Sequence, residues 1–367
     1  MLCVVYGHAY HYLGENSGLP FKIYALPMIG GVDTFFVLSG FLIGRILLRT
    51  LTQEILHRGL LLEFWIRRWY RTLPNYFLVL SLLLINYYLQ VRTLPEHVGL
   101  YAIFLQNFAS PHPPFFEEAW SLSIEEWFYL LTPLPLYISL KLIKPNYRQS
   151  IFIFWIIAVI VTITAFRSYR AANIDQLTLA LWDSELRKQV LTRLDSLMYG
   201  VLGAYCSLYR SALWTRNTKV FASIGLALII GDKLLHSFME INTFYLFYSK
   251  YLTFTVSSVA VLLMLPFLSS WKTSQGCLGK FITLISIISY SMYLLNLTPI
   301  QGILMPALLK QFIDLGFESF STPLLQYSLY WLLTMMCSFL LYYGYEKPMT
   351  ELREKWHLKN TVHLSAD

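Results

Sequence analysis

The chain has few charged residues for its length. Asp, Glu, Lys and Arg together make up 13% of its 367 residues, whereas an ordinary soluble domain has about 25%. Apolar residues make up 56% and aromatic residues 17%. This composition excludes an ordinary soluble protein and predicts a chain that crosses a membrane several times.

Other features are missing as well. The cysteines Cys3, Cys206, Cys277 and Cys337 are scattered without the paired spacing of a metal site or a disulfide framework, so we predict neither. The first residues have no basic stretch and no cleavage site, which argues against a secretory signal peptide. The sequence has no nucleic-acid-binding motif and no internal repeat of the kind that marks many transporters.

Apolar stretches of about 20 residues predict an all-α, polytopic integral membrane helix bundle with about ten transmembrane spans. Nine stretches lie near residues 28–48, 73–91, 120–143, 150–167, 194–209, 220–236, 248–268, 281–300 and 323–343. Residues 1–13 resemble the outer part of a tenth span, and a re-entrant or interfacial pattern at 96–108 leaves the count open by one. We expect residues 1–346 to form the transmembrane domain and residues 347–367 a C-terminal tail.

Lys and Arg gather at alternate ends of these spans. When the ends are assigned alternately to the two sides of the membrane, 18 of the 28 basic residues fall on one side. The positive-inside rule makes this side cytoplasmic and also places the C-terminus in the cytoplasm. The net charge of +7 is therefore explained by membrane topology, and we predict no nucleic-acid partner.

Ionisable residues interrupt three spans at one expected depth. His8, Asp33 and the adjacent Glu125 and Glu126 each lie about five residues, or roughly 8 Å, below the outer surface. A His beside an Asp is the arrangement of a general base, and the natural substrate of such a base is a hydroxyl group. Groups that snorkel to the headgroups, or a buried pair that fixes helix register, are the alternatives, and His11 one turn above fits them equally well.

Three arginines precede the third span on the predicted cytoplasmic side. Arg67, Arg68 and Arg71 occupy about one helical turn, with Trp and Tyr residues between them. An ordinary basic anchor with an aromatic belt explains this pattern. A site for a phosphorylated cytosolic ligand explains it as well, because guanidinium groups bind phosphate through two parallel hydrogen bonds. The pattern alone leaves both interpretations open.

Seven motifs in order resemble the membrane O-acyltransferases of the acyltransferase 3 family. They are GGVDTFFVLSGFLI, FWIRRWYRTLP, FLQNF, FFEEAWSLSIEEWFYL, RLDSLMYGVLGA, ISYSMYLLNLTP and YEKP. The resemblance implies about ten spans in a bacterial inner membrane. It also implies transfer of an acyl group, commonly acetyl, from cytosolic acetyl-CoA to hydroxyls of extracytoplasmic glycans such as lipopolysaccharide, with acyl-CoA as a substrate and no tightly bound cofactor.

The resemblance also assigns roles to individual residues. Catalytic residues would be His8, Asp33 and Glu125, and the acyl-CoA would be bound by Arg67, Arg68 and Arg71. Residues that support the reaction or bind the acceptor would be Ser121, Glu126, Arg193, Asp195 and Asn296. Many relatives have histidine where this chain has Asn296, which cannot exchange protons near neutral pH.

Relatives also have an arginine eleven positions before the histidine, which here would precede Met1. Only about 13 of the roughly 20 residues needed to cross a bilayer are present in the first span. We therefore expect the chain to lack its true N-terminus. The alternative function is a proton-coupled transporter of a glycan or lipid precursor that uses the same His, Asp and Glu as a proton relay. The enzyme is favoured because the sequence shows no inverted repeat and no matched pair of broken helices.

Overall fold

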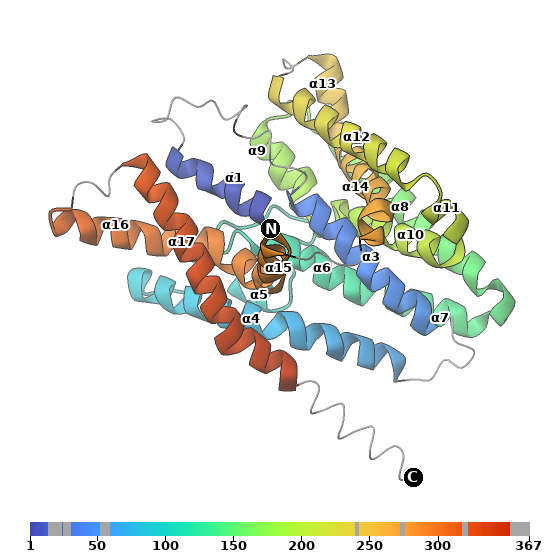
Figure 1. Cartoon of the computed structure of the whole chain (residues 1–367), viewed down its shortest axis with the longest axis horizontal. Coiled ribbons are helices and arrows are strands. Elements are labelled where there is room, and N and C mark those ends of the chain that lie inside the picture. The colour runs from blue at the N-terminus through green and yellow to red at the C-terminus, as the bar shows by residue number, and fades with distance from the viewer. Residues whose placement is uncertain are drawn as a thin grey trace, which may run out of the picture.

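The computed structural model describes residues 1–13, 24, 31–51, 59–238, 242–271, 276–317 and 322–352. Throughout these ranges the regular elements are helices, with no strand, so the predicted all-α bundle is confirmed (Figure 1). The C-terminal residues 353–367 of the expected tail lie outside the described residues.

The α-helices are α1 (Leu2–Leu13), α3 (Gly31–Leu51), α4 (Leu60–Val91), α5 (Val98–Ala102), α6 (Ala119–Leu131), α7 (Pro133–Leu142), α8 (Arg148–Ala172), α9 (Leu179–Leu181), α10 (Leu194–Tyr209), α11 (Ser211–Thr215), α12 (Thr218–Phe238), α13 (Thr243–Phe247), α14 (Thr253–Ser270), α15 (Cys277–Leu295), α16 (Met305–Asp314) and α17 (Pro323–Leu341). In the described ranges, four π-helical segments join or extend them: η3 (Trp182–Arg187), η5 (Tyr248–Leu252), η6 (Asn296–Leu304) and η8 (Tyr342–Glu346).

Seven helical stretches among the described residues are long and apolar enough to cross a membrane. They contain α3, α4, α8, α12, α14, α15 and α17. The other predicted spans correspond to shorter helices, namely α1, α6 followed by α7, and α10. The predicted span at 73–91 begins earlier than expected, because helix α4 starts at Leu60 and carries the three arginines within its first half.

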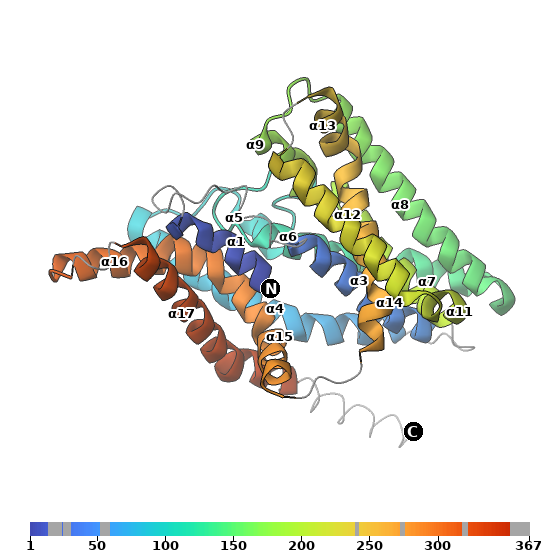
Figure 2. The same ribbon diagram turned by 45° about the horizontal axis from the view of Figure 1, so that its top comes forward.

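The helices form two groups that meet along the middle of the molecule (Figures 1 and 2). In one group, α10 packs against α3, α8 and α14, and α12 packs against α14. In the other group, α17 packs against α1 and α15. Helix α6 lies between the groups, whereas α4 runs along the lower side of both (Figure 1).

Two glycines bring α3 and α10 into backbone contact. A Cβ atom on Gly40 would lie 1.9 Å from the Leu197 carbonyl oxygen, and one on Gly200 would lie 2.0 Å from the Val37 carbonyl oxygen. Small residues allow this close approach of helices, which is common in membrane proteins. Because Gly40 faces Leu197 and Gly44, four residues later, faces Val201, four residues after Leu197, the two helices run in parallel and begin at the same end of the bundle.

The segment before α6 folds into the bundle. Gln106 and Asn107 are buried, and their side-chain amides donate hydrogen bonds to the Ser123 hydroxyl at 2.6 Å and to the Trp120 carbonyl at 3.0 Å. Phe116 is fully buried. Helix α6 therefore begins inside the protein rather than at its surface, and every residue along α6 lies deeper than an entry at the surface would place it.

Candidate active site

His8 on α1 is held by an amide. Its Nδ1 lies 2.5 Å from Asn296 Oδ1 in η6. Both hydrogens of the Asn296 amide are already used, because Nδ2 donates to the carbonyls of Met292 at 2.9 Å and Tyr293 at 2.8 Å. Oδ1 must therefore accept from His8 Nδ1, and in the neutral ring, which has a single N–H, this leaves Nε2 with its lone pair. Nε2 has no hydrogen-bond partner within the described part of the chain.

Asp33 does not hold His8. It forms an ion pair instead with Arg193, the residue that directly precedes α10. Asp33 and Arg193 each lie seven residues before the glycine, Gly40 or Gly200, at which α3 and α10 touch. The helix crossing thus brings a guanidinium to the carboxylate, and a full opposite charge neutralises a partly buried carboxylate better than a neutral imidazole does. The predicted pairing of His8 with Asp33 is replaced by two separate pairs.

Arg193 also lies beside a second ion pair, which is buried more completely, and the Phe254 ring contacts the arginines of both pairs. Its guanidinium carbon lies 4.2 Å from the centre of the Phe254 ring, and that of Arg167 lies 5.2 Å from the centre of the same ring. Arg167 of α8 pairs with Asp195 at 2.8 Å, and both side chains are almost completely buried. We call Asp33, Arg167, Arg193 and Asp195 the ion-pair centre.

The two glutamates of α6 lie deeper than expected. Tyr129 donates to Glu125 at 3.1 Å and is itself 2.9 Å from Ser39, which lies six residues, or about 9 Å, along α3 from Asp33. Glu126 accepts from Thr72 of α4 at 2.8 Å. The depth predicted for Glu125 and Glu126 was counted from a helix that starts at the membrane surface. Because α6 starts inside the protein instead, both glutamates lie deeper.

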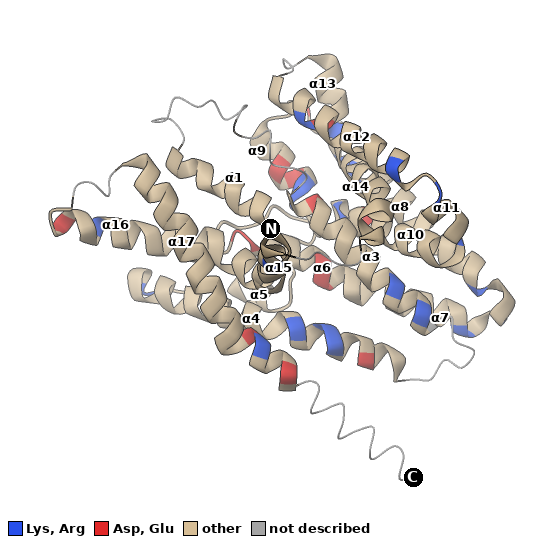
Figure 3. Ribbon diagram, in the orientation of Figure 1, with Lys and Arg blue, Asp and Glu red and all other residues tan. Residues whose placement is uncertain are grey.

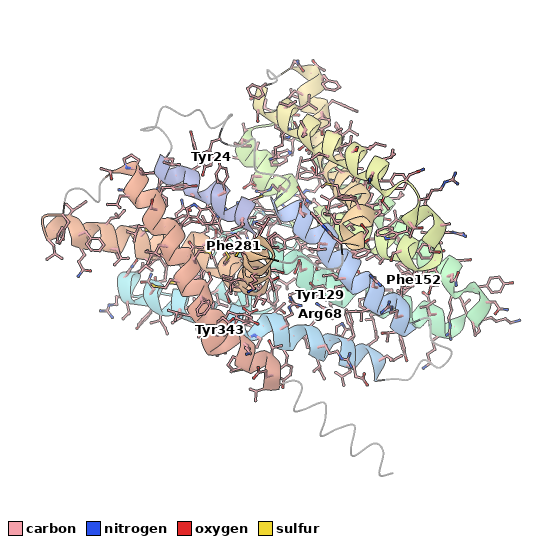
Figure 4. All side chains as sticks on the ribbon, in the orientation of Figure 1. Tyr24, Arg68, Tyr129, Phe152, Phe281 and Tyr343 are labelled. Carbon is pink, nitrogen blue, oxygen red and sulfur yellow. The ribbon has the colours of Figure 1, made fainter. Side chains whose placement is uncertain are left out.

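Arg68 faces these glutamates. Its guanidinium carbon lies 6.0 Å from the centre of the Tyr129 ring, and the two side chains meet between α4 and α6 (Figure 4). Arg68 is half-buried, whereas Arg67 and Arg71 are exposed. Figure 3 shows basic residues of α3 and α4 at this end of the bundle, separate from a second charged zone around α9 and η3. Of the three predicted acyl-CoA ligands, Arg68 alone points inward.

Ser121 connects the two ends of the site. Its hydroxyl lies 2.5 Å from the hydroxyl of Tyr293, which also donates to the Glu118 carbonyl at 3.1 Å. Seven residues of α6 separate Glu118, which lies beside η6, from Glu125, which lies beside Arg68. At 1.5 Å per residue this separation is about 10 Å along the helix axis.

Segment 182–193 covers the end of α6 near His8. Lys188 bridges Glu117 at 3.2 Å and Asp183 at 2.7 Å, and the Arg187 guanidinium lies 4.9 Å from the Trp120 ring centre. Beside this cover a cleft of about 770 Å³ opens at the end of α8. Its polar lining includes Tyr169, Arg170, Asn173, Asp175, Gln176 and Glu185. The cleft thus lies between the last turns of α8 and η3.

Two groups in the segment before α6 have shifted pKa values. Burial lowers the pKa of His112 to about 4, so this ring is neutral at physiological pH. Burial raises the pKa of Glu118 to about 7, although hydrogen bonds from Thr298 and Leu297 oppose that rise.

Sequence reasoning missed three residues of the site. Glu118 lies at the level of His8, where Glu125 and Glu126 were expected. The sequence feature that could have identified it is a carboxylate near aromatic residues, directly before an apolar span. Arg167 ends an apolar stretch, a position that favours a buried partner. Tyr293 is in a motif of which only the asparagine was singled out. The described residues contain no group of three His, Cys, Asp or Glu side chains that could hold a metal.

Comparisons with known proteins identify the family to which the chain is similar. A family model described as "Acyltransferase domain" matches residues 1–343. "O-acetyltransferase OatA" of Staphylococcus aureus (strain NCTC 8325 / PS 47) is 37% identical over 143 residues, 34% of this chain and 23% of the relative. "Putative peptidoglycan O-acetyltransferase YrhL" of Bacillus subtilis (strain 168) is 33% identical over 137 residues, 33% of this chain and 21% of the relative. The matched part is thus less than a quarter of either relative's length. No solved structure matches the chain.

Proposed function

Because the chain belongs to the acyltransferase 3 family, we propose that it is a membrane-bound O-acyltransferase that moves an acyl group, in the first instance acetyl, from cytosolic acyl-CoA to a hydroxyl of an extracytoplasmic glycan or glycolipid. The observation that carries this proposal is the His8–Asn296 pair, which leaves Nε2 ready to accept a proton. The names of the relatives support O-acetylation, and one of them names peptidoglycan as an acceptor.

The reaction requires one proton acceptor and one activated acyl group. Nε2 of His8 takes the proton of the acceptor hydroxyl, and the hydroxyl oxygen attacks the carbonyl carbon of the thioester. The new C–O bond forms and the C–S bond breaks. Coenzyme A leaves as a thiolate, which takes up the proton held by His8. Asn296 keeps the ring in the required tautomer because its Oδ1 accepts from Nδ1.

The donor and the acceptor approach from opposite ends of α6. We place the phosphates of acyl-CoA at Arg68, with Arg67 and Arg71 on the exposed side, so that the thioester arm follows α6 towards His8. The short separation along α6, about 10 Å, supports this route. The acceptor comes from the side of the cleft and of segment 182–193. With this orientation the arginine end is cytoplasmic, as the positive-inside rule predicts.

The test uses membranes that contain the wild type, His8→Ala or Asp33→Asn at equal protein levels, with radiolabelled acetyl-CoA. We expect label in the envelope glycan fraction of the wild type and a loss of about 10²- to 10⁴-fold in His8→Ala, as for removal of a general base. Asp33→Asn should lose less activity per folded protein, because Asp33 contacts Arg193 rather than His8.

Equal labelling by the wild type and His8→Ala would contradict the proposal. If the wild type transfers no label, counterflow of a glycan precursor in proteoliposomes without acyl-CoA would support the transporter instead. His8→Gln is a second variant that keeps a polar side chain if the alanine variant folds poorly.

A further inference from the structure

The helix that carries Asn296 changes its winding at that residue. Helix α15 is an α-helix up to Leu295, and η6 continues as a π-helix with Pro299 inside it. Wide π-turns are rare and occur often at functional sites, because they disturb the regular backbone hydrogen bonds. The change of winding therefore creates a local demand for side chains that can satisfy backbone groups.

Glu118 meets this demand on the N–H side. Its Oε1 accepts from the backbone N–H of Leu297 at 3.0 Å and of Thr298 at 2.6 Å. Its Oε2 accepts from the Thr298 hydroxyl at 2.5 Å. These three bonds hold the two residues that directly follow Asn296. Glu118 is only 2% exposed, so water has little access to replace them.

Asn296 meets the demand on the carbonyl side. The bonds from its Nδ2 to the Met292 and Tyr293 carbonyls turn Oδ1 towards His8. The orientation of His8 thus depends on the position of the Asn296 backbone, and this position depends on what holds the next two residues.

We propose that Glu118 is a positioning residue that fixes the start of η6 and thereby keeps Asn296 Oδ1 directed at His8 Nδ1. The inference rests on the proposed function for its catalytic readout. Glu118 itself does not touch the substrates; it acts through Asn296. Two further hydrogen bonds hold the backbone at Glu118 next to η6. The Glu117 N–H donates to Thr298 Oγ1 at 3.1 Å, and the Tyr293 hydroxyl donates to the Glu118 carbonyl.

Two other glutamates serve as controls. Glu117 is adjacent in sequence, but its carboxylate pairs with Lys188 and not with η6. Glu346 is a buried carboxylate that accepts from Asn75 of α4 at 2.8 Å and from Ser291 of α15 at 2.5 Å, five residues before η6 begins. Changing either residue removes a carboxylate without touching the residues that follow Asn296.

The experiment measures kcat and KM for acetyl-CoA and for the acceptor glycan in Glu118→Ala, Glu118→Gln, Glu117→Ala and Glu346→Gln, each normalised to folded protein. We expect Glu118→Ala to lower kcat about 10- to 100-fold, by analogy with the loss of a hydrogen-bond partner that orients a metal-bound histidine, with both KM values within about twofold of the wild type. Glu118→Gln should recover most of this loss, because its amide oxygen still accepts both N–H groups.

The control variants should keep the kcat of the wild type. If Glu118→Ala lowers kcat no more than the controls do, or if Glu118→Gln is as impaired as Glu118→Ala, the inference is overturned. If Glu118→Ala does not fold, Thr298→Val replaces it: this change removes the two hydrogen bonds of the hydroxyl, to Glu118 Oε2 and from the Glu117 N–H, and should lower kcat to a smaller extent with unchanged KM. An unchanged kcat in Thr298→Val would then overturn the inference. An inactive wild type would contradict the proposed function instead.

Discussion

The ion-pair centre and the His8–Asn296 pair solve the same problem in opposite ways. Both bury polar groups between helices. In the ion-pair centre, Arg167 pairs with Asp195 and Arg193 pairs with Asp33, so charge meets charge. In the His8–Asn296 pair, a neutral amide meets a neutral ring, and one ring nitrogen is left over.

This difference separates stability from chemistry. A buried ion pair is strongly held, since each partner left alone in an apolar site would be costly. A general base needs a free lone pair and a ring fixed in one tautomer, which a neutral partner such as Asn296 provides. The predictions that follow ask whether the two regions really divide these tasks.

The largest expected effect is on stability, in Asp195→Asn. The change leaves the Arg167 guanidinium, which is 1% exposed, without its carboxylate. We expect a loss of about 3–5 kcal/mol in the free energy of unfolding, as for other broken buried pairs. Denaturant-induced unfolding in detergent micelles measures this loss, with His8→Ala as the variant that should remain close to the wild type.

A double variant separates the lost pair from a general effect of mutation. Arg167→Met combined with Asp195→Leu removes both charges and should be more stable than Asp195→Asn alone, because no buried charge remains unpaired. If Asp195→Asn unfolds like the wild type, or if His8→Ala is as unstable as Asp195→Asn, the division between the two regions fails.

The sequence predicted which helices exist more successfully than it predicted which residues contact one another. The positions of the spans follow from the length of each apolar stretch, which is visible in the local sequence. The depth of Glu125 could not be predicted in the same way, because it depends on the buried segment before α6, where Gln106 and Asn107 find partners in α6.

The partner of Asp33 was hidden for a related reason. Arg193 lies 160 positions away in the chain, and only the contact of Gly40 and Gly200 between parallel helices brings it to Asp33. Both glycines are visible in the sequence, but their pairing is not. Long-range pairs of this kind are decided by helix packing rather than by local pattern.

A smaller effect is expected at Arg68, and it tests whether this residue serves stability, as the ion-pair centre does, or the reaction, as the His8–Asn296 pair does. Arg68 is half-buried against Tyr129, and we place a phosphate of acyl-CoA there. Arg68→Ala should raise KM for acetyl-CoA about tenfold, or about 1.4 kcal/mol, with kcat changed less than about twofold, because uniform binding is lost.

Arg67→Ala is the matched control, since Arg67 is the neighbouring arginine and is exposed. It should raise KM for acetyl-CoA less than Arg68→Ala does. Initial rates over a range of acetyl-CoA concentrations give both constants. A large loss of stability without a change in KM would assign Arg68 to the structural class of the ion-pair centre.

The smallest effect concerns the cleft, which lies outside both regions. Tyr169 lines it and is 69% exposed, whereas Tyr147, just before the start of α8, is 61% exposed and lies at the other end of that helix. If the acceptor passes through the cleft, Tyr169→Ala should raise KM for the acceptor about threefold, or about 0.6 kcal/mol, while Tyr147→Ala should leave it unchanged. Acceptor titrations at saturating acetyl-CoA measure the difference. Equal KM values for the two variants would exclude Tyr169 from the acceptor route and leave segment 182–193, which covers α6 beside His8, as the remaining approach.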